Sequence, residues 1–195
     1  TSPGLAMNTP LTNKSGTVGR FVPLIKHRLE DVPGIEPHQG DLRIGRLFVT
    51  GPNVMLGYLR AENPGVLEPP LDDWYDTGDI VGIDSQGFVK IMGRAKRFAK
   101  IGGEMVSLST VEAYASEIWP DILPIVVAVP DARKGERLVL LTSNDKVTRD
   151  AFIRHVRTQG LSELNIPAEI MHIDQVPVLG SSKPDYVTAT AIVKD

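Results

Sequence analysis

Residues 98–108 have the sequence FAKIGGEMVSL, in which two β-prone segments flank a glycine pair. Gly102 and Gly103 can adopt the positive φ angles of a tight turn, so this stretch predicts a β-hairpin. The next residues, STVE at 109–112, have the spacing of a helix capping box and predict a helix that ends near Ile118. A hairpin that leads directly into a helix indicates an α+β domain.

The residues after this helix continue the α+β pattern. Apolar runs predict strands at residues 125–129, 138–142 and 169–173. Thr148 predicts the N-cap of a second helix over residues 149–159, in which apolar residues recur on one face. These elements make up a compact domain of about 100 residues, which we place at residues 93–195.

The residues before the hairpin alternate short β-prone runs with Gly, Pro and Asn. The runs predict strands at residues 19–25, 26–29, 44–50 and 80–83, and their close spacing is typical of a small barrel or sandwich. The segment SGTVGR at 15–20 is similar to a phosphate-binding loop, but β-prone residues follow it where such a loop needs a helix. A glycine turn that enters a strand therefore fits this segment better.

Composition excludes several classes of function. The chain has 195 residues, 42% of them hydrophobic, and its 21 Lys and Arg against 24 Asp and Glu give a net charge of −3. These values support a packed core and provide no general attraction to nucleic acid or to anionic membranes. The chain has no Cys, and its four His lack the spacing of metal ligands, so neither a disulfide nor a metal site is expected. The longest apolar run, residues 122–129, is too short to cross a bilayer.

Two polar segments could contact a ligand. The loop LGSSKP at 179–184 presents Lys183 on a backbone of small residues, from which its ammonium could reach an anion or remain a solvated surface charge. The segment WYDTGD at 74–79 precedes an apolar strand, and a carboxylate of Asp76 or Asp79 could accept hydrogen bonds from a vicinal diol such as a ribose. The same carboxylates could instead stabilise a turn.

Four motifs occur together in one order: YDTGD at 75–79, GR at 93–94, KIGGE at 100–104 and a loop from Pro177 to Lys183. This set resembles the C-terminal part of the adenylate-forming superfamily, which includes acyl-CoA synthetases, luciferases and the adenylation domains of peptide synthetases. Three longer segments are similar to bacterial bifunctional enzymes that combine acyl-[acyl-carrier-protein] synthetase with 2-acylglycerophosphoethanolamine acyltransferase activity. They are RAKRFAKI, GEMVSL and LGSSKPDY, at residues 94–101, 103–108 and 179–186.

The resemblance implies a fold and a domain arrangement. Residues 1–92 would form a small β-barrel subdomain that closes a large N-terminal adenylation domain, and residues 93–195 would form a mobile C-terminal domain of the α+β class. The first residues, Thr1-Ser2-Pro3, would directly follow the family's Tyr-Gly-x-Thr-Glu motif, whose Glu is linked to Mg²⁺. That Glu and the family's phosphate loop would lie outside this chain, so the chain alone is expected to be inactive.

The resemblance also implies a role for each matching residue. Lys183 would touch both the acyl carboxylate and the α-phosphate of ATP, Asp79 would hold the ribose hydroxyls, and Arg94 would add a ribose or phosphate contact. Lys96 would be the hinge about which the C-terminal domain rotates between the two half-reactions. Gly103 would let a pantetheine arm pass close to the backbone in the thioester half-reaction, although a plain hairpin turn explains the glycine pair equally well.

Two residues depart from the family pattern. Ser182 precedes the lysine at a position where Gly is usual, which could stiffen the loop and lower activity. Glu104 follows Gly103 at a position where an aromatic residue or His is common. This second departure could reflect a carrier protein in place of coenzyme A as thiol donor.

The implied partners follow from the family reaction. ATP with Mg²⁺ would activate a long-chain fatty acid as an acyl-adenylate, and the phosphopantetheine thiol of acyl carrier protein would then displace AMP. A lysophospholipid would be a further substrate of the full-length protein, on the cytoplasmic side of the bacterial inner membrane. Two alternatives remain open, a fragment of an acyl-CoA ligase and a non-catalytic module that docks a carrier protein. Nucleic acid is not an expected partner.

Overall fold

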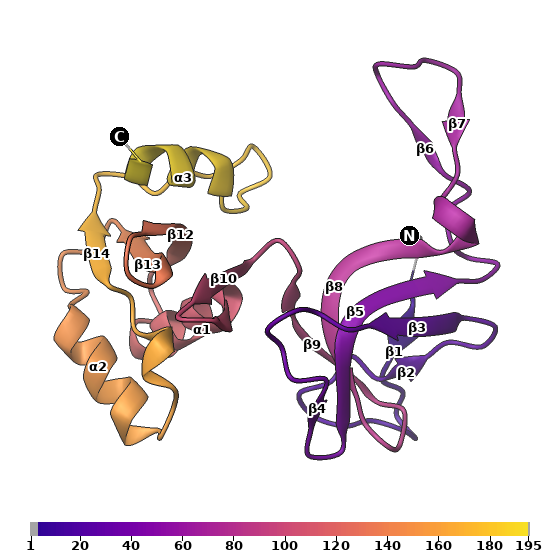
Figure 1. The fold of residues 1–195 in the computed structure, drawn as a ribbon, viewed down its shortest axis with the longest axis horizontal. Coiled ribbons are helices and arrows are strands. Elements are labelled where there is room, and N and C mark those ends of the chain that lie inside the picture. The colour runs from indigo at the N-terminus through magenta and orange to yellow at the C-terminus, as the bar shows by residue number, and fades with distance from the viewer. Residues whose placement is uncertain (1–3, 195) are drawn as a thin grey trace. The chain divides into compact units, whose positions relative to one another are not determined.

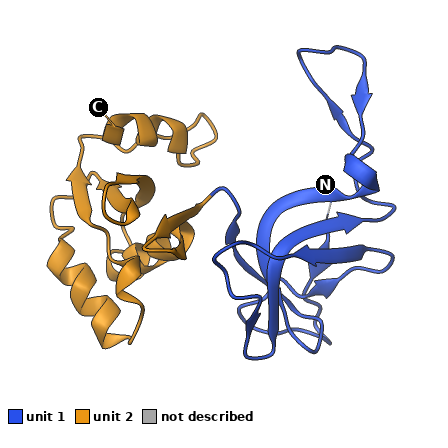
Figure 2. Cartoon of the chain, in the orientation of Figure 1, with its two compact units in different colours: residues 1–96 blue, residues 97–195 orange. Residues whose placement is uncertain are grey.

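The structure, a computed structural model, describes residues 4–194 and contains two compact units (Figure 2). The first unit comprises residues 1–96 and the second residues 97–195. The boundary expected between residues 92 and 93 falls inside strand β9 (Val89–Arg94). This strand belongs to the sheet of the first unit. The expectation for Thr1-Ser2-Pro3 lies outside the described residues.

The first unit is built on an antiparallel sheet with the strand order β3-β5-β8-β9 (Figure 1). Besides β9 its strands are β3 (Lys26–Glu30), β5 (Leu42–Thr50) and β8 (Tyr75–Ile83), and the short β4 (His38–Gln39) also pairs with β5. The sheet buries a core of Leu47, Val49, Val81 and Val89. In the described part of the chain no ladder joins β3 to β9, so the predicted barrel is an open sheet.

Short elements complete the first unit. They are the pair β1 (Ala6–Met7) and β2 (Arg20–Phe21), the pair β6 (Tyr58–Leu59) and β7 (Leu67–Glu68), and the 3-10 helix η1 (Leu71–Asp73). The strand predicted at residues 19–25 is limited to β2, because Pro23 and the positive φ of Leu24, 69°, interrupt it. The segment 15–20 leads into β2, as the glycine-turn interpretation requires.

The second unit is a five-stranded mixed sheet with helices on both faces. The strand order is β11-β10-β13-β12, and β14 pairs in parallel with β13. The strands are β10 (Phe98–Ile101), β11 (Glu104–Ser107), β12 (Ile125–Asp131), β13 (Gly135–Thr142) and β14 (Glu169–His172). The helices are α1 (Leu108–Ile118), α2 (Arg149–Thr158) and α3 (Tyr186–Lys194), with a short η2 (Glu163–Asn165). None of these helices is long and apolar enough to span a membrane.

Strands β12 and β13 alternate their side chains between two cores. One core joins them to α1 and α2 and includes Val126, Leu138, Leu140, Val111, Ala115, Phe152 and Val156. The other joins them to α3 and includes Ile125, Val127, Val139, Leu141 and Ala189. Both faces are buried, which explains why these two strands are nearly continuous apolar runs that the sequence identified.

The predicted hairpin is formed by β10 and β11, with Gly102 at φ 61° and Gly103 at φ 95° in its turn. The predicted start of the following helix was wrong by two residues. The cap is Ser107 rather than Ser109, because the Ser107 hydroxyl accepts the N–H of Thr110 at 3.4 Å. The chain can therefore pass from strand to helix without an intervening loop.

Of the other two α-helices, α2 was predicted and α3 was not. The Thr148 hydroxyl caps α2, as predicted, through a hydrogen bond from the N–H of Ala151 at 3.4 Å. Helix α3 was not predicted. Its sequence, YVTATAIVK, is rich in β-branched residues that favour strands, but the buried Ala189 packs it on the sheet.

Candidate functional site

The motif YDTGD lies inside strand β8, which corrects the predicted strand start at Ile80. The register of β8 on β5 shifts at this point, so the strand is locally distorted. Thr77 stabilises the distortion, because its hydroxyl donates to the carbonyl of Leu47 at 2.9 Å and accepts the N–H of Asp79 at 3.1 Å. Gly78, at φ 70°, supplies the left-handed conformation that this geometry requires.

Asp79 and Arg94 face each other across the ladder between β8 and β9. Nη1 of Arg94 lies 3.0 Å from Oδ1 of Asp79 and donates to the carbonyl of Thr77 at 3.1 Å. The side chain of Asp79 is 24% exposed, whereas that of Arg94 is 65% exposed. Burial raises the pKa of the Asp79 carboxyl, the charge of Arg94 opposes this, and the charge of Asp76 adds to it. The Asp79 carboxylate is thus held in place with acceptor capacity left for a ligand.

Asp76 has a different environment. Nε of Arg46 donates to its Oδ1 at 3.0 Å, Nη2 of Arg46 contacts its Oδ2, and the N–H of Gly78 donates to Oδ1 at 2.9 Å. Burial favours the neutral form, but these hydrogen bonds and the charge of Arg46 hold the pKa of Asp76 below its ordinary value. Asp76 therefore stabilises a distorted strand, whereas the alternative that the sequence offered was a turn.

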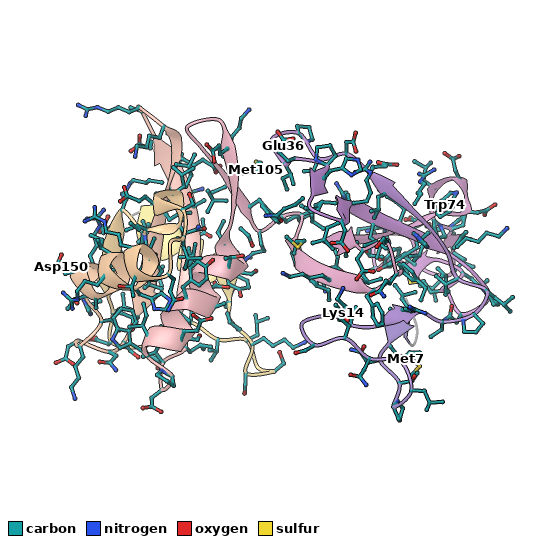
Figure 3. The ribbon with its side chains drawn as sticks, turned by 90° about the horizontal axis from the view of Figure 1, so that it is seen from below. Met7, Lys14, Glu36, Trp74, Met105 and Asp150 are labelled. Carbon is teal, nitrogen blue, oxygen red and sulfur yellow. The ribbon has the colours of Figure 1, made fainter. Side chains whose placement is uncertain are left out.

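A pocket of about 730 Å³ in the first unit is lined by Asp76, Tyr58, Tyr75 and Lys96, among others. The hydroxyl of Tyr58 donates to that of Tyr75 at 3.3 Å, and this hydrogen bond together with burial raises the pKa of Tyr75 to about 12. Trp74, labelled in Figure 3, also lines the pocket. The sequence did not reveal this pocket, because its walls come from segments far apart in the chain and no local pattern connects them.

Lys183 lies in a tight loop of the second unit, between β14 and α3. The N–H of Leu179 donates to the carbonyl of Lys183 at 2.8 Å, and the N–H of Ser182 donates to the carbonyl of Leu179 at 2.9 Å. Ser182 has a φ of 61°, in the left-handed region that residues with a Cβ rarely adopt. The backbone therefore fixes the loop while the side chain of Lys183 is exposed.

Gly103 lies at the exposed turn between β10 and β11. A Cβ at this position would meet open space, but the φ of 95° would strain any L-residue. The N–H of the neighbouring Gly102 donates to the carbonyl of Lys134 at 2.9 Å. This geometry is that of a plain hairpin turn, and it also leaves the backbone accessible to a ligand.

The predicted site residues are divided between the two units. Asp79 and Arg94 are in direct contact, and Lys96 is the last residue of the same unit. Gly103 and Lys183 belong to the second unit.

Proteins similar to this chain are found among curated sequences and solved structures, although no family model matches it. The mitochondrial medium-chain acyl-CoA ligase of Mus musculus is 31% identical over 93% of this chain and 30% of the relative. The long-chain-fatty-acid–CoA ligase of Yersinia pestis is 31% identical over 86% of this chain and 29% of the relative. ATP-bound MatB from Rhodopseudomonas palustris superposes with a TM-score of 0.70 and 28% identity, covering 92% of this chain and 36% of that one. The chain has the fold of the C-terminal part of adenylate-forming ligases.

This result confirms the predicted fold class, and the relatives and structural neighbours are adenylate-forming ligases, as the resemblance implied. The match extends over both units, because it covers 92% of the chain. The chain spans about 30% of the length of the curated adenylate-forming ligases it matches. The greater part of such a ligase therefore has no counterpart in these 195 residues.

Proposed function

We propose that this chain is the C-terminal portion of an ATP-dependent ligase that converts a carboxylic acid to an acyl-adenylate and then passes the acyl group to a phosphopantetheine thiol. The contact between Asp79 and Arg94 carries the proposal. It places a fixed, partly exposed carboxylate beside an exposed guanidinium, a pair suited to a ribose and a neighbouring phosphate. A structural neighbour solved with ATP bound supports ATP as the nucleotide.

Each half-reaction requires different residues of this chain. Lys183 stabilises the negative charge that builds up as the acyl carboxylate attacks the α-phosphate, since a positioned cation acts most strongly where charge develops. Asp79 accepts hydrogen bonds from the ribose hydroxyls in both half-reactions, and Arg94, which contacts Asp79, adds a ribose or phosphate contact. Mg²⁺ bound with ATP would neutralise phosphate charge. No residue of this chain is assigned to the metal.

A movement between the two units separates the half-reactions in this proposal. Lys96 is the hinge, consistent with its position as the last residue of the first unit. Rotation at Lys96 withdraws Lys183 and brings the exposed turn at Gly103 to the thiol donor. The open space around Gly103 supports this role, because a pantetheine arm needs close access to the backbone.

The acyl group and the thiol donor define the finer part of the proposal. We infer a long-chain fatty acid, acyl carrier protein as donor and a lysophospholipid as a further substrate of a bifunctional protein at the cytoplasmic side of the bacterial inner membrane. The support is the similarity of residues 94–101, 103–108 and 179–186 to such enzymes. Coenzyme A is a second candidate donor, since the two curated relatives described above are named as acyl-CoA ligases.

A comparison of thiol donors distinguishes these candidates. Full-length protein is incubated with ATP, Mg²⁺, a long-chain fatty acid and either carrier protein or coenzyme A, and thioester formation is followed by mass spectrometry. A preference for carrier protein supports the finer proposal, and a preference for coenzyme A supports an acyl-CoA ligase. The 195-residue chain alone should form no acyl-adenylate in this assay.

Two substitutions in the full-length protein test the residue roles. Lys183→Ala should lower ATP–pyrophosphate exchange by about 100- to 1,000-fold, the usual cost of removing one positioned charge, and affect thioester formation from supplied acyl-adenylate much less. Asp79→Ala should weaken nucleotide binding in both half-reactions. Unchanged nucleotide binding in Asp79→Ala would favour a non-catalytic docking module.

A further inference from the structure

A partly buried ionic cluster in the second unit joins three elements. Arg97 lies just before β10, Glu112 lies on α1 and Tyr186 begins α3. The side chains of Arg97 and Glu112 are only 13% and 14% exposed, and Nη2 of Arg97 contacts Oε1 of Glu112. Charged side chains are seldom buried to this degree unless they are paired, and removal of one partner leaves the other charge uncompensated.

Each side chain of the cluster has more than one partner. Oε1 of Glu112 accepts the N–H of Val126 at 2.9 Å, and Oε2 accepts the hydroxyl of Tyr186 at 3.4 Å. Nη1 of Arg97 donates to the carbonyl of Val126 at 2.8 Å, and the guanidinium lies over the Tyr186 ring with Cζ 3.6 Å from its centroid. The carbonyl of Arg97 also accepts the N–H of Leu108 at 3.0 Å. The cluster thus attaches the start of the second unit to β12 and α3.

Two residues of the cluster are close in sequence to residues of the proposed mechanism. Arg97 directly follows Lys96, and Tyr186 lies three residues after Lys183. The short connection to Lys183 is itself fixed, because the N–H of Asp185 donates to the carbonyl of Pro177 at 3.0 Å. The side chain of Asp185 also accepts two backbone hydrogen bonds in the first turn of α3, each of 3.1 Å.

We propose that Arg97, Glu112 and Tyr186 form an anchor that makes the residue after the hinge and the Lys183 loop parts of one rigid body. Glu112 and Tyr186 are then positioning residues for Lys183 in acyl-adenylate formation. This inference rests on the proposed function. When the anchor is intact, rotation at Lys96 moves the ammonium of Lys183 by a fixed amount. When it is loosened, the ammonium departs from the place where charge develops, and a misplacement of about 1 Å can cost about 100-fold in rate.

Tyr186→Leu in the full-length protein tests the anchor. Leucine keeps an apolar side chain but removes the ring beside Arg97 and the hydroxyl that Glu112 binds. ATP–pyrophosphate exchange should fall by about 10- to 100-fold, while thioester formation from supplied acyl-adenylate changes by less than about twofold. Tyr186→Phe keeps the ring and loses only the 3.4 Å hydrogen bond, so this variant should retain most of the exchange activity of the unsubstituted protein.

Tyr114→Leu is a matched control, because Tyr114 is also partly buried but packs in the core shared by α1 and α2. It should lower stability and reduce both half-reactions alike. The anchor proposal is wrong if Tyr186→Leu reduces both half-reactions in the same way, or if exchange stays within about twofold of the unsubstituted protein. Lys183→Ala distinguishes the causes of failure. If Lys183→Ala lowers exchange by about 100- to 1,000-fold and Tyr186→Leu leaves it within about twofold, only the anchor is rejected; if neither substitution lowers exchange, the role of Lys183 is rejected as well.

Discussion

Ser182 adopts a left-handed backbone conformation immediately before the exposed Lys183. This conformation costs a residue with a Cβ about 1–2 kcal/mol, whereas glycine adopts it without steric penalty. The hydrogen bond from the N–H of Ser182 to the carbonyl of Leu179 holds the backbone in place. The structure thus gives a physical reason for glycine at this position in the family pattern, and it shows that serine can occupy it at some energetic cost.

Ser182→Gly should therefore raise the free energy of unfolding by up to about 1 kcal/mol, because the relieved strain exceeds the added entropy of the unfolded chain. Ser181 is the control, because its φ is not positive. Ser181→Gly should lower stability by about 0.4–1 kcal/mol through chain entropy alone. Urea denaturation of both variants measures the contrast, and a loss of stability in both would argue against strain at Ser182.

The raised pKa of Asp79 predicts how nucleotide binding depends on pH. The ordinary value is 3.8, burial raises it, and the charge of Arg94 partly opposes the rise. In the proposed role, the ionised carboxylate accepts the hydrogen bonds of the ribose hydroxyls more strongly than the protonated form does. Affinity should therefore decline on acidification at a higher pH than an ordinary aspartate would give. Arg94→Ala should move this decline to still higher pH. AMP titration calorimetry on the full-length protein measures both shifts, and an unmoved midpoint in Arg94→Ala would contradict the assignment.

Protonation of Asp79 affects the stability of the fold in the opposite direction to its effect on nucleotide binding. A carboxyl with a raised pKa binds its proton more tightly in the folded protein than in the unfolded chain. The contribution of Asp79 to folding is therefore present at low pH and is lost as the pH rises through its folded pKa. Acidification should weaken nucleotide binding at this residue without weakening the fold there.

Among the elements, those with local signals were predictable. The glycine pair specified the β10–β11 hairpin, and Thr148 specified the start of α2. Helix α3 was not predicted, because its helical state depends on contacts with the apolar residues of β12 and β13 that pack against it. No local sequence pattern reports such contacts. The YDTGD motif resembles a turn in sequence, but Thr77 hydrogen bonds and the neighbouring ladders keep it within β8.

The start of α1 provides a test of which serine caps the helix. Ser107→Ala removes the hydroxyl that caps the helix and should cost about 1 kcal/mol of unfolding free energy. Ser109→Ala, at the position that the sequence predicted as the cap, lies inside the helix and should change stability little. Denaturation curves of the two variants decide between the caps. A larger loss of unfolding free energy in Ser109→Ala than in Ser107→Ala would support Ser109 as the cap.

For the whole molecule, the sequence motifs identified the candidate residues but not their surroundings. Asp79 and Arg94 were each identified, yet their direct contact depends on the pairing of β8 with β9. The pocket lined by Tyr58, Tyr75 and Lys96 and the anchor around Glu112 were missed, because both depend on residues that only the tertiary fold brings together. Motif spacing cannot report such contacts.

The proposed hinge predicts a difference between two substitutions in the full-length protein. The residues beside Lys96 are fixed, because the N–H of Ala95 donates to the carbonyl of Gly78 and the carbonyl of Arg97 accepts the N–H of Leu108. Lys96→Pro should restrict φ to about −65° and hinder rotation, so exchange should persist while transfer to the thiol is lost. Lys96→Ala leaves the backbone free and should change both half-reactions modestly. Normal thioester formation in Lys96→Pro would show that the rotation occurs elsewhere, and circular dichroism checks that the variant is folded.

Helix α3 also has a consequence for biosynthesis. All five predicted site residues precede Tyr186, yet the apolar residues Ile125, Val127, Val139 and Leu141 pack against this late helix. A nascent chain therefore carries an uncovered apolar surface until residues 186–194 have left the ribosome. A stop codon in place of the codon for Tyr186 should yield a protein that keeps Lys183 but sediments as aggregate after cell lysis, and recovery of a soluble, protease-resistant product would contradict this. Burial of this face of the second unit during translation thus waits for α3.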